Sequence, residues 1–101
     1  MIAGSDGAET LWVVASPENV VSTDLSGGTA LLDLRTGQYF TLDGVGSLVW
    51  TLLQTPSSRT RIVDAILEEY EVAPDECDRD VEALLGELQG AALVETVAPA
   101  G

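Results

Sequence analysis

Apolar and polar residues alternate along two adjacent segments of the chain, Thr29 to Arg35 and Gln38 to Asp43, with Thr36 and Gly37 between them. Strict alternation predicts strands that bury one face, and a glycine at the junction can take the positive φ that a two-residue turn needs. We therefore expect a β-hairpin with one face toward a core. The expected inward residues are Leu32, Leu34, Phe40 and Leu42, and the expected outward residues are Asp33, Arg35, Tyr39 and Thr41.

Two β-prone runs precede the hairpin, Leu11 to Ala15 and Val20 to Leu25, and the turn-forming stretch Ser16-Pro17-Glu18-Asn19 separates them. Either run can supply the first strand of the sheet. The ends of the chain, residues 1–10 and 96–101, show no apolar periodicity. We expect both ends to be mobile tails around a single domain at residues 11–95.

Two segments after the hairpin carry apolar residues at helical spacing. Asp43 stands where an N-cap belongs, and the apolar stripe behind it stops before Pro56, so a first helix is expected between them. Either Ser58 or Thr60 can cap a second helix, which should stop near residues 71–73. The expected buried positions are Val45, Leu48, Val49 and Leu52 in the first helix and Ile62, Ile66, Leu67 and Tyr70 in the second.

A third helix is expected to begin at Pro74 or Asp75 and to end at Gly90. Its apolar residues recur at the period that places them on one helical face. This stripe consists of Cys77, Val81, Leu84, Leu85 and Leu88. Two or three strands followed by three helices predict an α+β fold, in which a small antiparallel sheet carries the helices on one face.

The chain carries 17 acidic residues against four basic ones, all of them arginines, so its formal net charge is −13. Such a charge repels phosphate backbones and anionic lipids, which argues against nucleic acid and membranes as partners. No apolar run approaches the roughly 18 residues of a membrane-spanning helix, and the first ten residues lack the pattern of a secretory signal. We therefore expect a soluble, cytoplasmic protein.

The chain contains no histidine and one cysteine, Cys77, so His-based triads, multi-cysteine metal sites and intramolecular disulfides are excluded. Cys77 falls in the first turn of the third helix, where the helix dipole can activate a thiolate. Its acidic neighbours oppose activation, and its place in the apolar stripe favours a packed thiol. Those neighbours lack the spacing of a calcium loop and suit a solvated helix start; they are Asp75, Glu76, Asp78 and Asp80. We expect no enzymatic activity, no metal and no cofactor.

The segment Gln38 to Asp43 is the last strand of the expected sheet, which makes it an edge strand if sequential strands are neighbours. It is uncharged from Gln38 to Leu42 and contains no proline, whereas natural edges are usually protected by lysine, proline or a bulge. Two explanations stay open. A helix or a second chain can cover the edge, or a peptide can add to it as a further strand.

A long string of residues resembles one protein family. The stretch LLDLRTGQYFTLDGVGSLVW (residues 31–50), a second helix after Thr60 and the closing LLGELQGAALV are similar to the PqqD-like family, also called RiPP recognition elements. The resemblance covers about Val20 to Val94. Its specific residues are Leu31, Leu32, Asp33, Thr36, Gly37, Tyr39, Phe40, Leu42, Gly46 and Trp50. One departure is Ala73, which stands where many relatives have an acidic cap before the proline.

The resemblance implies a winged helix-turn-helix-like fold, with a three-stranded antiparallel sheet followed by three helices. It also implies that the leader segment of a precursor peptide lies between the third strand and the third helix and extends the sheet. The implied leader-binding residues are Gln38, Tyr39, Phe40, Thr41, Leu42 and Asp43 on the strand and Asp80, Val81, Leu84, Leu85 and Leu88 on the helix. No catalytic residue is implied.

The stand-alone length and the particular residues are most similar to the leader-binding protein of lasso-peptide biosynthesis. That resemblance implies a non-catalytic adaptor that delivers the precursor to a cysteine-protease-like leader peptidase, with a lasso cyclase acting afterwards. Two alternatives stay open: a peptide chaperone of another peptide-modifying pathway, and a winged-helix regulator, which the charge of −13 disfavours. Free in solution, the protein is expected to be a monomer or a weak dimer.

Overall fold

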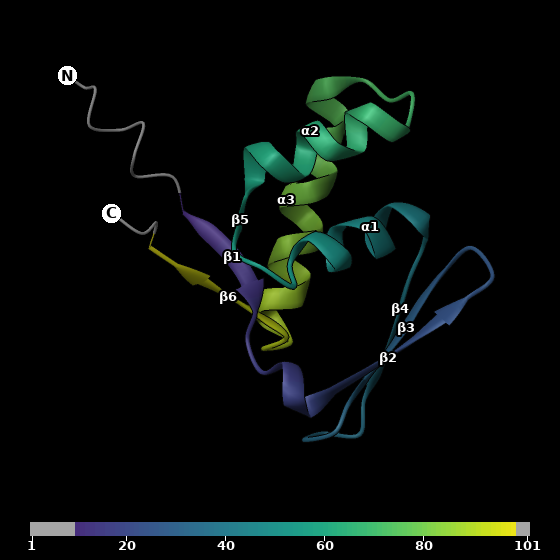
Figure 1. Cartoon of the computed structure of the whole chain (residues 1–101), viewed down its shortest axis with the longest axis vertical. Helices are drawn as coiled ribbons and strands as arrows, with labels where there is room; N and C mark the ends of the chain where they lie inside the picture. The colour runs from purple at the N-terminus through teal and green to yellow at the C-terminus, as the bar shows by residue number, and fades with distance from the viewer. Residues whose placement is uncertain (1–9, 99–101) are drawn as a thin grey trace.

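The computed structural model describes residues 10–98, and these residues form an α+β fold of two small sheets and three α-helices (Figure 1). Of the tails expected at residues 1–10 and 96–101, residues 1–9 and 99–101 lie outside the described residues. The strands are β1 (Leu11–Val14), β2 (Val20–Leu25), β3 (Gly28–Asp33), β4 (Tyr39–Leu42), β5 (Ser57–Ser58) and β6 (Val94–Val97). The helices are the 3-10 turn η2 (Pro17–Asn19) and the α-helices α1 (Gly44–Leu52), α2 (Arg59–Glu69) and α3 (Pro74–Gly90).

The expected three-stranded antiparallel sheet is present, in the order β2-β3-β4. Its second connection is longer than the predicted two-residue turn at Thr36 and Gly37, because β3 ends at Asp33 and β4 begins at Tyr39. Gly37 does take the positive φ that was expected, at 76°. Its backbone N–H donates to the Asp33 carbonyl at 2.7 Å, while the Asp33 N–H donates to the Gln38 carbonyl at 2.9 Å. The loop therefore spans residues 34–38.

The face expected for β3 is wrong, and the face expected for β4 is right. Leu31 and Asp33 are buried on β3, whereas Leu34 lies beyond the strand and is exposed. Phe40 packs against the core as predicted, and Tyr39 is exposed. A buried carboxylate at position 33 is tolerated because the backbone N–H and the Nε–H of Arg35 both donate to Asp33 Oδ1. An alternation pattern cannot anticipate this pairing.

A second sheet, in the order β5-β1-β6, was not expected from the sequence. The first β-prone run forms its central strand β1, so the run from Val20 supplies the first strand of the other sheet. Leu11 pairs with Val97 and Val14 with Val94, which carries β6 past the domain limit expected at residue 95. Only long-range pairing orders this four-residue strand, since its sequence VETV has no distinctive local signal.

The helix starts follow from their capping residues. The Asp43 side chain accepts a hydrogen bond from the Gly46 N–H at 2.8 Å, which starts α1. Ser58, one of two candidates, caps α2 by accepting from the Arg61 N–H at 3.1 Å. Tyr70 was expected to be buried, but it is the C-cap of α2 and is 37% exposed. No helix within residues 10–98 combines the length and the apolar character that a membrane crossing requires.

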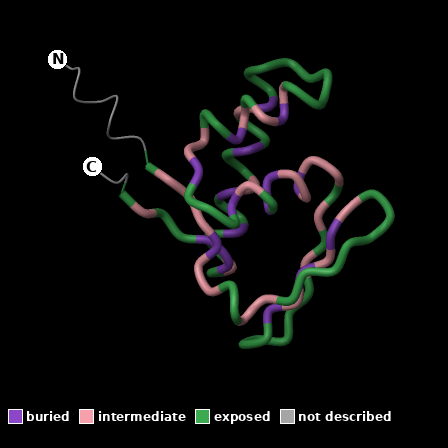
Figure 2. The backbone as a smooth tube through the Cα atoms, viewed as in Figure 1, coloured by how far each residue is buried: buried purple, intermediate pink, exposed green. Residues whose placement is uncertain are grey.

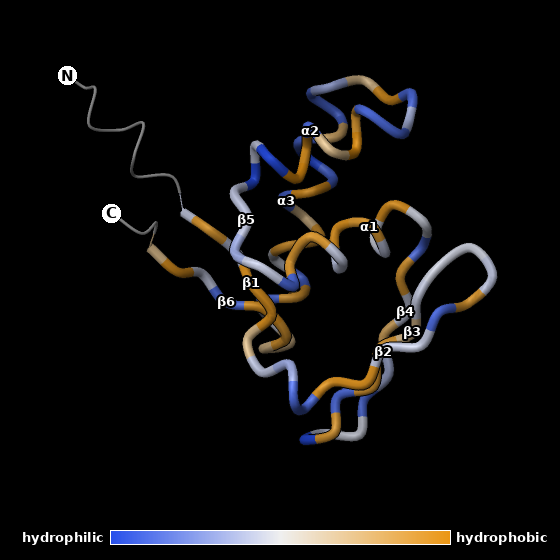
Figure 3. Tube along the Cα trace, viewed as in Figure 1, coloured by the Kyte–Doolittle hydropathy of each residue, from blue (hydrophilic) through white to orange (hydrophobic). Residues whose placement is uncertain are grey.

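The core lies between the helices and the two sheets, where buried residues of α1, α2, α3 and β6 meet (Figures 2 and 3). Of the predicted stripe of α3, Leu84 is half-buried and the rest is buried. The buried hydrophobic residues are Val14, Leu31, Val49, Trp50, Leu53, Ile62, Ile66, Cys77, Val81, Leu85, Leu88, Leu93 and Val94. Helix α3 packs against α2 and β6, whereas α1 packs against β3 and β4, so the group of helices lies between the two sheets.

Helix α3 reaches Gly90 as expected, but a different residue reverses the chain. Ala92 has a φ of 62°, in the left-handed region, and the N–H of Leu93 donates to the Leu88 carbonyl at 2.9 Å. The Ala92 N–H donates to the Gln89 carbonyl, so the two bonds form a Schellman turn with alanine in the position that usually holds glycine.

Replacing Ala92 with glycine is expected to raise the free energy of unfolding by about 0.5–1 kcal/mol, because glycine adopts a positive φ without steric cost. Ala92 is exposed, so little packing is lost with its methyl group. Chemical denaturation measures the change. Ala91→Gly is the control, since Ala91 has a φ of −88° and gains nothing from glycine. An Ala92→Gly protein no more stable than the parent would contradict this account.

Candidate functional site

Strand β4 lies at an edge of its sheet, as predicted from the sequence. In an antiparallel pair, successive residues point their N–H and C=O groups alternately toward the neighbouring strand and away from it. The Asp33 N–H bonds to Gln38, and Leu31 and Thr29 stand opposite Phe40 and Leu42. The backbone N–H and C=O groups of the even-numbered residues of β4 therefore point toward β3 and bond to it. The backbone groups of the two odd-numbered residues, Tyr39 and Thr41, face outward from the edge.

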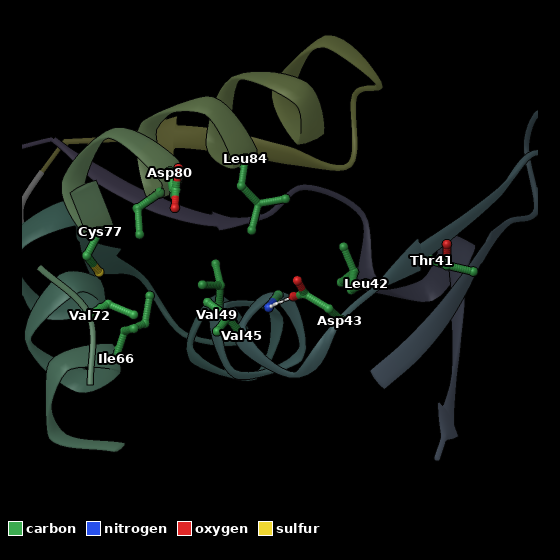
Figure 4. Close-up of a pocket in the computed structure, with 12 residues that line it drawn as sticks. Thr41, Leu42, Asp43, Val45, Val49, Ile66, Val72, Cys77, Asp80 and Leu84 are labelled. Atoms are coloured by element: carbon green, nitrogen blue, oxygen red, sulfur yellow. Dashed lines mark hydrogen bonds between the residues drawn. The ribbon is translucent and has the colours of Figure 1, made fainter. Parts of the chain in front are cut away.

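A groove of 340 Å³ opens where β4 runs into α1, with α3 as its opposite wall (Figure 4). Most of its lining is aliphatic: Leu42 comes from β4, Val45 and Val49 from α1, and Val81 and Leu84 from α3. In Figure 4 the side chains of Leu84 and Asp80 project from α3 into the space between α3 and α1. The groove therefore continues the exposed edge of β4 into an apolar slot between two helices.

The structure brings together part of the predicted site. Of the residues expected to bind the leader, those that line the groove are Thr41, Leu42, Asp43, Asp80, Val81 and Leu84. Gln38, Tyr39 and Phe40 lie further along the hairpin, outside the groove. Leu85 and Leu88 are buried on the core side of α3. The stripe of α3 thus divides between the core and the groove.

Six lining residues were not predicted: Val45, Gly46, Val49, Ile66, Val72 and Cys77. A signal for Val45 and Val49 was present in the sequence, because they follow Asp43 directly at a helical spacing of four. Ile66 and Val72 come from the end of α2 and the segment behind it, which only the packing of α2 against α3 brings to this place. The groove therefore draws on β4, α1, α2, the segment between α2 and α3, and α3.

The charged side chains in the lining are acidic, Asp43 and Asp80. The Asp43 side chain caps the start of α1 by accepting a hydrogen bond from the Gly46 N–H. The Cys77 thiol is buried, and burial raises its pKa, with Asp80 and Asp78 acting in the same direction. A raised pKa keeps the thiol neutral near neutral pH. The groove has the character of a binding slot, with an apolar wall and a negative rim.

Asp33 and Arg35 tie the end of the hairpin to the turn after α3. The Arg35 guanidinium donates to Asp33 Oδ1 through Nε at 3.4 Å and to the Ala92 carbonyl through Nη2 at 3.1 Å. The other Asp33 oxygen, Oδ2, is buried without a hydrogen-bond partner among the described residues. The Arg35 backbone N–H holds the pKa of Asp33 below its ordinary value, and the guanidinium adds to this against the opposing effect of burial.

The lowered pKa predicts how Asp33 contributes to stability at different pH values. A carboxyl whose pKa is lower in the folded state stabilises the fold above its ordinary value of 3.8, and that contribution is lost as the pH falls through the folded-state value. The melting temperature of Asp33→Asn should therefore lie below that of the parent at pH 7, and the gap should close below pH 3.8. A constant gap across this range would show that the ionised form of Asp33 is not what stabilises the hairpin.

Comparison with a family model decides what kind of protein this is. The model for PqqD, coenzyme PQQ synthesis protein D, matches residues 28–94. The chain belongs to the PqqD family. The match extends from the start of β3 to the first residue of β6, so it includes the exposed edge of β4 and the whole groove. The family resemblance expected from the hairpin motif is confirmed.

Two solved structures are similar to this PqqD-family chain. A chain from "TbiB1 in Complex with the TbiA(beta) Leader Peptide" is 38% identical, with a TM-score of 0.72 over 82% of this chain and 94% of that one. A chain from "Lasso peptide synthetase B1 complexed with the leader peptide" is 24% identical, with a TM-score of 0.71 over 83% and 96%. The second shows the fold alone. A search among curated proteins gives no match.

Proposed function

We propose that this PqqD-family chain is a non-catalytic adaptor, which binds the leader segment of a ribosomal precursor peptide and delivers it to a processing enzyme. The observation that carries the proposal is the exposed edge of β4 leading into an apolar groove. The 38% identical neighbour, TbiB1, is described in complex with a leader peptide, which supports the same role here.

The leader would bind as a fourth strand of the β2-β3-β4 sheet. The outward N–H and C=O groups of Tyr39 and Thr41 would supply main-chain hydrogen bonds, which give affinity with little dependence on sequence. Selectivity would come from the groove, where an apolar leader side chain would pack between Val45 and Val49 on one wall and Leu84 on the other.

The adaptor would act by tethering, which raises the local concentration of the leader beside the enzyme that cuts it. Its own side chains support a binding role, since the sequence has no histidine and its one thiol is buried and held neutral. The enzyme we propose is a cysteine-protease-like leader peptidase of lasso-peptide biosynthesis, with a lasso cyclase acting afterwards in the cytoplasm. We further assign the arrangement of sheet and helices to the winged helix-turn-helix class.

Isothermal titration with the TbiA(beta) leader peptide tests this function. Micromolar or tighter binding is expected, because β4 offers a preformed edge and the groove a preformed apolar slot. A scrambled peptide of the same composition is the control. The absence of heat at millimolar peptide, or equal binding of the scrambled peptide, would argue against leader recognition.

A further inference from the structure

The β2-β3-β4 sheet has a second face, opposite the core, with unusual composition. The strand register places Val21, Leu32 and Tyr39 in one row across the three strands. Neighbouring residues alternate between the two faces of a strand, so these three side chains point away from Leu31 and the core. We call this surface the outer face; it consists of Val21, Thr23, Leu25, Ala30, Leu32, Tyr39 and Thr41.

The outer face is apolar and exposed. Val21 is 45% exposed, Leu25 48% and Tyr39 73%, and these are half of the six large hydrophobic residues that are exposed in the described part of the chain. A fourth, Leu34, follows directly after β3. The outer face carries no charged residue, in a chain whose net charge is −13. Single exposed apolar residues are ordinary, whereas a contiguous row usually marks a contact surface for another protein.

Within residues 10–98, the fold leaves this face open. Helix α1 packs against β3 and β4, and the only other element in substantial contact with the sheet is η2, beside β2. Figure 1 shows the sheet at the periphery, with the helices on one side of it, and Figure 2 shows most of β2 exposed, from Val21 to Leu25. An antiparallel sheet commonly leaves one face in water, but that face is then normally polar, whereas the outer face here is mostly apolar.

We propose that the outer face docks a second protein, whose contact surface is an apolar patch bordered by Lys and Arg. The negative charge of the chain favours a partner with a basic surface over other occupants. The chain's net charge of −13 attracts a cationic partner and repels both a second copy of itself and an anionic membrane. The uncharged centre needs no ion to be desolvated, so apolar burial can drive the contact.

The outer face and the exposed edge of β4, where the leader is proposed to bind, use different atoms of the same strand. The edge of β4 offers the backbone of Tyr39 and Thr41, whereas the outer face offers side chains that stand perpendicular to the sheet. A leader strand beside β4 leaves the outer face uncovered, so the two partners can be bound at once. Resting on the proposed function, the inference identifies the docked protein as the processing enzyme.

The test uses the leader peptidase from the same biosynthetic gene cluster as a purified, immobilised probe. Val21→Asp places a charge in the row that Val21 forms with Leu32 and Tyr39. It should weaken peptidase binding at least tenfold, while affinity for the TbiA(beta) leader stays within twofold of the parent. Ser22→Asp is the matched control, because it adds the same charge one residue along β2 on the opposite face. It should change neither affinity.

Leu25→Ser supplies a second variant without a charge change, and it should weaken peptidase binding by several fold. Unchanged peptidase binding in Val21→Asp with intact leader binding would overturn the docking surface while leaving the proposed function standing. Dimerisation of the parent that Val21→Asp abolishes, or binding of the parent to anionic vesicles, would overturn it in favour of those occupants. Absence of leader binding in the parent would instead count against the proposed function.

Discussion

A Thr41→Pro protein is expected to bind the leader peptide about 100-fold more weakly than the parent. The Thr41 N–H faces outward from β4, so proline removes a bond to the added strand and leaves a leader carbonyl without its donor. The proline ring also occupies the position of the incoming backbone. A lost bond and an unsatisfied buried acceptor together cost roughly 3 kcal/mol, which corresponds to about two orders of magnitude in Kd.

The sheet itself provides the matched control for Thr41→Pro. Ser22 lies on β2, the other edge strand, and its N–H also points away from β3, because the Leu34 N–H bonds to the Asn19 carbonyl and sets the alternation on that side. Ser22→Pro therefore carries the same backbone restriction without touching the proposed binding edge. Isothermal titration should find its leader affinity unchanged. Equal losses in the two variants would indicate damage to the sheet and would remove the support for strand addition at β4.

Gly28→Ala is expected to destabilise the fold by about 2 kcal/mol or more, in the range of overpacked positions. A Cβ at position 28 would overlap the carbonyl oxygen of Leu42, which is a backbone atom that cannot rotate away. The end of β4 must then shift away from β3, and Leu42 and Asp43 line the groove. Leader affinity should fall together with the melting temperature.

Gly86→Ala provides the comparison for Gly28→Ala. An added Cβ at this α3 position meets nothing within 4 Å, so alanine should stabilise the helix by up to about 1 kcal/mol. Thermal unfolding of the two variants separates steric overlap from the general effect of replacing glycine. A Gly28→Ala protein that melts with the parent and binds the leader normally would show that the approach of β3 to Leu42 does not fix the groove.

Much of the fold could be predicted from local patterns. Asp43 and Pro56 bracket α1, and Pro74 opens α3, because capping and proline geometry act within one turn of chain. The position of β4 at an edge also followed from the order of the strands. The face of β3 did not, since the burial of Asp33 depends on its hydrogen bonds with Arg35.

The candidate site, like the fold, could be predicted only in part from the sequence. The sequence identified Thr41, Leu42 and Leu84 as candidates but could not tell which residues of the α3 stripe face the core. Leu84 and Leu85 are adjacent in sequence, yet one lines the groove and the other is buried. Their difference follows from the way α3 packs against α2 and β6, which no short window of sequence encodes.

By itself, the sequence determined the α+β class, the three helices, the unprotected strand and the family motif, because each depends on residues that are close along the chain. Only the tertiary structure decided the second sheet, the buried side of β3, the lining of the groove and the exposed outer face. Pairing of β1 with β6 joins residues more than 80 positions apart, from Leu11 to Val97. Such contacts are selected by how well whole elements pack together, and local propensity contributes little to that choice.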